Sequence, residues 1–284
     1  MSAYNSFAVV GGGMIGLPII NALAARHVSI VLLSRPDSSA KTVPSGVQVV
    51  KVDYTDAAAA AAVFKAHNVD VVLSTVNSVA SAAQKSLVEA ARLAAVKLFV
   101  PSEYGMPTEG HTEGVVGDKN RIAGKYLLDW SAGIPSTRFY TGLFIDLIPW
   151  LVGHSEHGKF RIVGKGEAPA SYTAAADVAG FVAHVLTTLP RSELENRVFR
   201  LEGDRASMKD LGALFKAPVE HVDHITGEAG GLKTRLLTAG DTGRGSTGWD
   251  EITKAEGSGI KAAGSANALW PGHQWKTIKD FHNL

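Results

Sequence analysis

The chain has 284 residues, of which 45% are hydrophobic and 19% are charged, and its formal net charge is +1. This composition excludes a mostly disordered chain, and the near-neutral charge gives no electrostatic reason to expect nucleic acid or an anionic membrane as a partner. The absence of cysteine excludes disulfides, thiolate metal sites and thiol nucleophiles. The first residues lack the pattern of a signal peptide, and no run of about 18 apolar residues follows, so we expect a soluble cytoplasmic protein.

Short runs rich in β-branched residues alternate with longer helical runs through the first half of the chain. The predicted strands lie near residues 7–11, 29–33, 47–51, 70–74, 97–101 and 136–140. The predicted helices lie near residues 15–26, 56–67, 79–95 and 118–132. This alternation is typical of a parallel sheet with helices on both faces, in which ligands bind at the carboxyl ends of the strands. The predicted fold class is therefore α/β, a Rossmann-type doubly wound parallel sheet.

The first predicted strand runs into a glycine-rich turn with the spacing Gly-x-Gly-x-x-Gly, and an apolar helix follows. In a dinucleotide-binding turn these glycines permit a tight turn, a close approach to a pyrophosphate and close packing of helix on strand. The spacing alone is weak evidence because glycine is frequent, with 30 in this chain. Its place at the first strand of a repeating pattern strengthens it. We predict that the pyrophosphate lies at the helix amino terminus, against Gly11, Gly13, Met14, Ile15 and Gly16.

The second predicted strand ends at Ser34 and Arg35, without the acidic residue that an NAD-preferring site offers to the ribose hydroxyls. Arg35 can instead pair with a 2′-phosphate through its fork of donors, and Lys41 can add a point charge. An ordinary solvated arginine in a loop is the alternative interpretation. With the glycine turn taken into account, we predict NADP(H) as the cofactor and expect Ser34, Arg35 and Lys41 to contact it.

The fourth and fifth predicted strands end at the same edge of the sheet as the glycine turn. Backbone and hydroxyl groups at this edge commonly face a cofactor, although simple termination of a strand is the alternative interpretation. The residues that we expect to contact the cofactor here are Ser74, Thr75, Val76, Pro101, Ser102 and Glu103.

In the second half of the chain the alternation loosens. A strand and a turn are predicted over residues 158–166, and an amphipathic helix over residues 174–189. We expect residues 1–150 to form an NADP-binding Rossmann domain and residues 151–284 a smaller C-terminal substrate-binding lobe, partly interleaved with the first. The glycine-rich segment 240–248 is expected to be a solvated loop, with a mobile lid as the alternative.

Residues 100–105 read Val-Pro-Ser-Glu-Tyr-Gly and resemble the Pro-Ser-Glu-(Phe/Tyr)-Gly signature of the isoflavone reductase-like and NmrA-like group of atypical short-chain dehydrogenases. The likeness extends to other motifs in that family's order, and it covers roughly residues 6–190. These motifs are the glycine turn and residues 34–35, 52–56, 74–76, 133–135 and 140–144. The resemblance implies NADPH binding. It also implies reduction of phenolic and flavonoid compounds in the catalytic members, whereas other members bind the dinucleotide as regulators with little or no turnover.

The proton donor departs from the typical short-chain dehydrogenase pattern, because no tyrosine of this chain has a lysine four positions later. The resemblance implies that a lysine near the start of the helix after the Pro-Ser-Glu-Tyr-Gly loop takes this role. Lys119 is the nearest match, and Lys125 is the alternative. Such a lysine needs a pKa lowered by burial or by neighbouring cations such as Arg121 to exchange a proton near neutral pH. A solvated lysine on an amphipathic helix is the competing interpretation.

Four apolar side chains are candidates for the wall of a pocket for an aromatic substrate, although each alone is more often part of a core. They are Tyr104, Met106, Phe144 and Trp150. The histidine pairs at 154/157 and 221/224 lack a third ligand at a recognised spacing, so we expect no metal site.

We therefore predict an NADPH-dependent reductase of small aromatic or phenolic compounds, of the flavonoid or lignin type. The alternative is an NADP(H)-binding redox sensor with little or no turnover, which acts through a regulatory protein partner. Neither function involves direct contact with nucleic acid or a membrane.

Overall fold

The structure is a computed structural model, and it describes residues 4–77, 83–112, 119–120 and 133–284. The chain divides into two compact units, each built from separate stretches of sequence. Unit 1 comprises Met1–Glu103, Gly110–Arg138 and Val178–Val198. Unit 2 comprises Tyr104–Glu109, Phe139–Asp177 and Phe199–Leu284.

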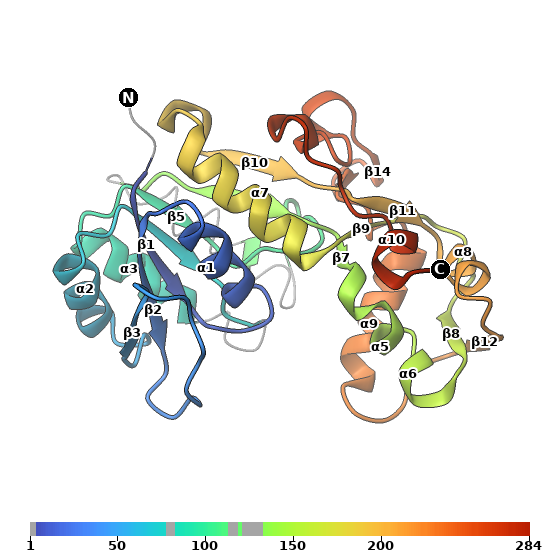
Figure 1. The fold of residues 1–284 in the computed structure, drawn as a ribbon. Helices are drawn as coiled ribbons and strands as arrows, with labels where there is room; N and C mark the ends of the chain where they lie inside the picture. The colour runs from blue at the N-terminus through green and yellow to red at the C-terminus, as the bar shows by residue number, and fades with distance from the viewer. Residues whose placement is uncertain (1–3, 78–82, 113–118, 121–132) are drawn as a thin grey trace. The chain divides into compact units, whose positions relative to one another are not determined.

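Unit 1 is built on a five-stranded parallel sheet (Figure 1). The strands are β1 (Ser6–Val10), β2 (Ser29–Ser34), β3 (Gln48–Lys51), β4 (Val71–Ser74) and β5 (Leu98–Val100). They lie in the order β3-β2-β1-β4-β5, and each neighbouring pair is parallel. The strand order therefore reverses between β1 and β4, which is where doubly wound sheets bind their ligands. The predicted fold class is confirmed.

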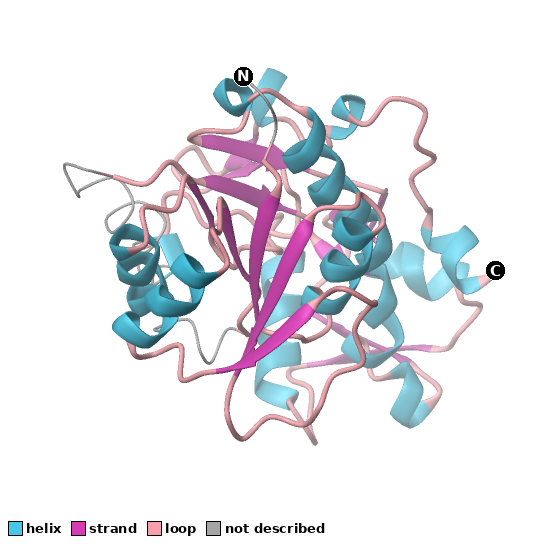
Figure 2. Ribbon diagram, turned by 60° about the vertical axis from the view of Figure 1, so that its left-hand side comes forward, coloured by secondary structure: helices cyan, strands magenta, loops and turns pink. Residues whose placement is uncertain are grey.

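Helices cover both sides of this sheet (Figure 2). They include α1 (Gly16–Ala24), α2 (Ala57–Ala66) and α3 (Gln84–Leu93). Because successive side chains of a strand point to opposite faces, Val10 and Leu33 pack with Phe64 of α2 and Leu87 of α3 on one face. Helix α1 lies against β1 and β2. Asp56 caps α2, since its carboxylate accepts hydrogen bonds from the first-turn N–H groups of that helix.

Unit 2 contains small sheets and short helices around its own core. Its strands are β7 (Leu143–Phe144), β8 (Phe160–Val163), β9 (Ala170–Thr173), β11 (Asp204–Ala206), β12 (Val219–Val222), β13 (Trp249–Asp250) and β14 (Ala255–Glu256). Its α-helices are α5 (Ile148–Leu151), α6 (His154–His157), α8 (Met208–Leu214), α9 (Gly230–Asp241) and α10 (Ile278–His282). Its 3-10 helices are η3 (Ile145–Leu147), η5 (Gly259–Lys261) and η6 (Asn267–Leu269). Phe160, Tyr172 and Leu237 are fully buried in its core.

Several elements lie at or across the sequence limits of the two units. Strands β6 (Thr137–Tyr140) and β10 (Arg197–Arg200) pair with each other, and α7 (Ala175–Thr188) and η4 (Arg191–Glu193) lie between them in sequence. The predicted strands and helices of the first half agree with the structure to within a few residues where they are described. The predicted helix near 118–132 lies outside the described residues, except for the helical residues Lys119 and Asn120.

The prediction of a solvated loop over residues 240–248 is wrong. Ser246 and Thr247 are buried, and the Thr247 N–H donates a hydrogen bond of 2.9 Å to Ser171 Oγ. The Gly245 carbonyl accepts a 3.1 Å bond from the Ser171 N–H. A Cβ on Gly245 would lie 2.6 Å from the Cβ of Ala170. Glycine is therefore frequent here because the backbone packs closely against β9, and the sequence composition alone does not distinguish this from an exposed loop.

Among the residues that the structure describes, no helix combines the length and the hydropathy needed to span a bilayer.

We expect Phe64→Ala to lower the free energy of unfolding by about 3 to 5 kcal/mol, because it leaves a cavity under a helix whose other buried residues are alanines. Denaturant unfolding followed by circular dichroism measures this change. The neighbouring exposed residue provides a control, since Lys65→Ala is expected to stay within about 0.5 kcal/mol of the wild type. Equal unfolding midpoints for the two variants would contradict the packing assigned to α2.

Candidate functional site

The structure gives a different reason for glycine at each of the three motif positions, Gly11, Gly13 and Gly16. Gly11 has a φ of +103°, which an L side chain rarely adopts. A Cβ on Gly16 would lie 2.0 Å from the Gly11 carbonyl oxygen and 2.7 Å from Thr75 Oγ1, so only glycine allows α1 to start this close to the strand end. A Cβ on Gly13 would meet nothing within 4 Å. The turn thus leaves open space at the position where a dinucleotide fingerprint brings the backbone to a pyrophosphate.

The amino end of α1 is available to an anion. Ile15 occupies the N-cap position, and it makes no side-chain capping hydrogen bond. In α1 the Leu17 N–H donates to the Gly13 carbonyl at 3.2 Å and Pro18 has no N–H, so donors for an anion lie before Leu17. The helix dipole adds a partial positive charge at this end. Met14, the residue before Ile15, is exposed. This part of the turn therefore has the donors and the space that a pyrophosphate requires.

Hydrogen bonds fix the strand ends beside the turn. The Thr75 hydroxyl lies 2.6 Å from the Gly11 carbonyl oxygen and 3.0 Å from that of Val10. The Ser102 hydroxyl donates to the Val76 carbonyl at 2.7 Å. The Thr75 and Ser102 side chains thus hold this edge of the sheet together, and their contact with a cofactor remains a prediction.

Two further predicted residues on these strand ends have distinct environments. The Ser74 hydroxyl is buried and has no hydrogen-bond partner in the part of the chain that the structure describes. Pro101 is buried, and its carbonyl accepts a hydrogen bond from the Glu103 N–H at 2.8 Å, which turns the chain sharply after β5. The structure thus brings the ends of β1, β4 and β5 to one edge, as the parallel order requires.

The end of β2 carries exposed positive charge. The Arg35 side chain is 61% exposed, and its Nε lies 3.6 Å from Asp37 Oδ1. The Lys41 side chain passes over the glycine turn, because its Cγ would be 3.3 Å from a Cβ on Gly12. Ser34 is buried, and its hydroxyl lies 2.5 Å from Ser38 Oγ. These cations lie where the adenosine end of a dinucleotide would be, if its pyrophosphate occupied the turn.

Lys119 reaches the end of β5. Its ammonium donates a hydrogen bond of 3.2 Å to the backbone carbonyl oxygen of Glu103, whose side chain is buried. Burial lowers the pKa of Lys119 below its ordinary value, because the ammonium loses water, while the nearby Glu103 carboxylate acts in the opposite direction. Lys119 is half-buried in the structure, and its role as the catalytic lysine remains a prediction. Lys125 and Arg121 lie outside the described residues.

The four predicted substrate residues all belong to unit 2 and have different neighbours. Tyr104 is buried and stacks on Phe139 with 6.3 Å between ring centroids, and its hydroxyl has no hydrogen-bond partner among the described residues. Burial raises the pKa of the Tyr104 hydroxyl well above its ordinary value. Met106 and Phe144 are half-buried. Trp150 is half-buried and packs on the core of unit 2. Their place in a common substrate wall remains a prediction.

Sequence reasoning missed a buried lysine beside Trp150. Lys233 of α9 is fully buried, donates a 2.5 Å hydrogen bond to Glu156 Oε1 and lies 4.9 Å from the centroid of the Trp150 ring. The Lys233 ammonium lowers the pKa of the Glu156 carboxyl through this hydrogen bond. Nothing in the local sequence distinguishes Lys233 from an exposed helix lysine, because its partner is 77 positions away.

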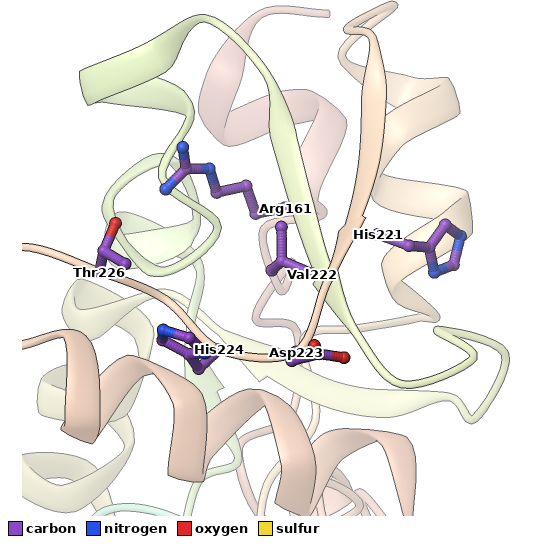
Figure 3. A pocket seen from close by; sticks show the side chains of 6 residues that line it. All are labelled: Arg161, His221, Val222, Asp223, His224 and Thr226. Carbon is purple, nitrogen blue, oxygen red and sulfur yellow. The ribbon is translucent and has the colours of Figure 1, made fainter.

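A separate open pocket lies beside β8 and β12 in unit 2, lined by Arg161, His221, Val222, Asp223, His224 and Thr226 (Figure 3). Its two histidine rings lie on opposite sides of the chain and do not converge. His221 Nδ1 instead lies 3.0 Å from the Gly164 carbonyl oxygen. Within the described ranges, no group of three or more His, Asp or Glu side chains is placed to hold a metal ion.

Substitution of two glycines separates their roles in the apo protein. We expect Gly16→Ala to lower the thermal unfolding midpoint, because its Cβ would overlap the Gly11 carbonyl. Gly13→Ala is expected to leave the midpoint close to that of the wild type, because its Cβ would enter open space. Differential scanning calorimetry without ligand measures both. A destabilised Gly13→Ala variant, or an unaffected Gly16→Ala variant, would contradict this geometry.

The fold is similar to those of two solved reductases. One is the binary complex of leucoanthocyanidin reductase with NADPH from Vitis vinifera, with a TM-score of 0.76, 19% identity and coverage of 98% of both chains. The other is an NADPH-dependent quinone oxidoreductase from Escherichia coli, with a TM-score of 0.75, 19% identity and coverage of 98% of both chains. At these identities the likeness concerns the fold alone.

Similarity in sequence identifies the family. The chain is 33% identical over 227 residues to the oxidoreductase BOA1 of Botryotinia fuckeliana, which covers 72% of this chain and 72% of that protein. The family model described as the NmrA-like family matches residues 5–224. The resemblance seen in the short motifs is thereby confirmed, and the chain belongs to the NmrA-like family.

Proposed function

We propose that this protein is an NADPH-dependent reductase of small aromatic or phenolic compounds. The observation that carries the proposal is the position of Lys119, a partly buried ammonium at the carboxyl end of β5. This is the same edge of the sheet at which the open glycine turn follows β1. A proton donor and a pyrophosphate site on one edge are what a reductase requires, whereas a protein that only binds the dinucleotide has no need of the lysine.

The residues of unit 1 fit NADP(H) on two counts. The open space at Gly13 and the uncapped amino end of α1 suit a pyrophosphate. The exposed guanidinium of Arg35 suits a 2′-phosphate, and no acidic side chain stands in its place at the end of β2. Similarity in fold to reductases solved with NADPH and in sequence to a protein named an oxidoreductase supports the same assignment.

In this mechanism the bound nicotinamide supplies the hydride. The glycine turn would hold the pyrophosphate, and Arg35 would pair with the 2′-phosphate of the adenosine ribose. Lys119 holds a proton at Nζ and donates it to the oxygen or carbon of the substrate that gains negative charge as the hydride arrives. The lowered pKa of Lys119 makes this transfer easier than it is from an exposed lysine. Tyr104, Met106, Phe144 and Trp150 of unit 2 are proposed to contact the aromatic substrate.

Lys119→Met is expected to lower kcat by about 100-fold or more without changing NADPH affinity, because it removes the proton donor and leaves the cofactor residues in place. NADPH oxidation, followed by absorbance over a panel of flavonoids, quinones and lignin-type phenols, measures this loss. Lys125→Met is the matched variant. If Lys125→Met abolishes turnover and Lys119→Met does not, the assignment of Lys119 is wrong. If the wild type binds NADPH but oxidises it with no compound, the sensor alternative replaces the reductase.

The wild-type rate is also expected to depend on pH in a defined direction. The donor must carry its proton, so turnover falls as the pH rises through the pKa of Lys119. Burial places that pKa below the ordinary value of 10.5, and the alkaline limb of the profile should therefore lie below that of a solvated lysine. A turnover rate that rises as the pH increases through the pKa of Lys119 would contradict its role as an acid.

Arg35→Ala is expected to reduce the preference for NADPH over NADH by about tenfold or more, since it removes the charged partner of the 2′-phosphate. Calorimetric titration with both coenzymes measures the ratio of the two dissociation constants. An unchanged ratio would show that Arg35 is an ordinary loop residue.

A further inference from the structure

The turn that follows β2 is held by a lysine from the neighbouring strand. Lys51 is the last residue of β3, and it pairs in register with Ser34, the last residue of β2. The Lys51 ammonium donates hydrogen bonds to the backbone carbonyl of Ser38, to Ser38 Oγ at 2.9 Å and to the Arg35 carbonyl at 3.3 Å. A lysine ammonium has three donors. All three therefore point into the turn formed by residues 35–38.

Hydrogen bonds between residues of the turn also stabilise it. The Ser38 N–H and the Ser38 hydroxyl both donate to the Arg35 carbonyl, at 3.1 Å and 2.7 Å. The Ser38 hydroxyl also lies 2.5 Å from Ser34 Oγ. Pro36 restricts the backbone immediately after Arg35. The backbone of Arg35 is thus fixed at its carbonyl by two neighbours, Ser38 and Lys51.

The side chain of Arg35, in contrast, is left available. Its contact with Asp37 is long, at 3.6 Å, and both side chains are mostly exposed. An exposed pair of this kind contributes little, and a phosphate group with two negative charges competes with it effectively. The arrangement presents an exposed guanidinium on a backbone that hydrogen bonds hold in place.

We propose that Lys51 is a positioning residue for recognition of the 2′-phosphate of NADP(H). It holds the backbone of the turn that presents Arg35 to the phosphate. This inference rests on the proposed function, because it assumes that NADP(H) binds at this edge of the sheet. It adds a residue for which the sequence pattern gave no indication, since Lys51 lies 16 positions beyond Arg35.

The test compares the dissociation constants of NADPH and NADH, measured by isothermal titration calorimetry on the full chain. Lys51→Met is expected to weaken NADPH binding by about tenfold and to change NADH binding by less than about twofold. Lys51→Arg keeps the charge and several donors, and it should retain most of the preference. Lys65→Met is the control, because Lys65 is an exposed lysine in the last turn of α2 within the same unit.

A double-mutant cycle separates positioning from a general effect of charge. In the Arg35→Met background, Lys51→Met is expected to have little further effect on NADPH binding, because the turn that Lys51 holds no longer carries the guanidinium that binds the phosphate. A full tenfold effect in that background would overturn the positioning role. Circular dichroism confirms that each variant is folded.

The remaining outcomes are distinguishable. A wild type that prefers NADPH together with a Lys51→Met variant that keeps the same preference overturns the role of Lys51 alone. A wild type that binds neither coenzyme overturns the proposed function, and the role of Lys51 with it.

Discussion

The carboxyl edge of the sheet in unit 1 depends on one close approach, that of Gly16 to the end of β1. A Cβ at Gly16 would lie only 2.0 Å from the Gly11 carbonyl and 2.7 Å from Thr75 Oγ1, so the first turn of α1 is packed directly against the strand ends. This contact sets where the amino end of the helix points. Since the Thr75 hydroxyl also lies within 3.0 Å of the Val10 and Gly11 carbonyls, the ends of β1 and β4 form one rigid group with the turn.

The proposed chemistry uses this rigidity. Groups that bind a charged cofactor act best when they are already in place before it arrives, because no free energy is then lost in ordering them. The open space at Gly13, the cations at the end of β2 and the lysine at the end of β5 all lie on the edge that the parallel strand order creates. The family assignment supports the fold and the class of protein, whereas a role of unit 2 in binding a substrate remains a prediction.

Local patterns in the sequence predicted the parts of the fold that local physics determines. Glycine spacing, alternating strands and helices, and an arginine directly after β2 each depend on residues that are near neighbours in sequence. Contacts between distant residues could not be predicted in this way. The pair of buried Lys233 with exposed Glu156 and the Arg200–Glu109 pair join residues 77 and 91 positions apart. The prediction of a solvated loop over residues 240–248 was wrong because glycine is frequent both in exposed loops and where backbones pack closely. Lys119 was found only through the resemblance to a family.

The central claim is that a pyrophosphate binds against the open face of Gly13. Calorimetric titration of NADPH into the wild type and into a Gly13→Val variant tests it most directly, because a Cβ at this position meets nothing within 4 Å and the valine side chain would occupy the space that the cofactor needs. The account predicts heat and saturable binding for the wild type and none for the variant. Equal binding by both proteins, or no binding by the wild type, would contradict it.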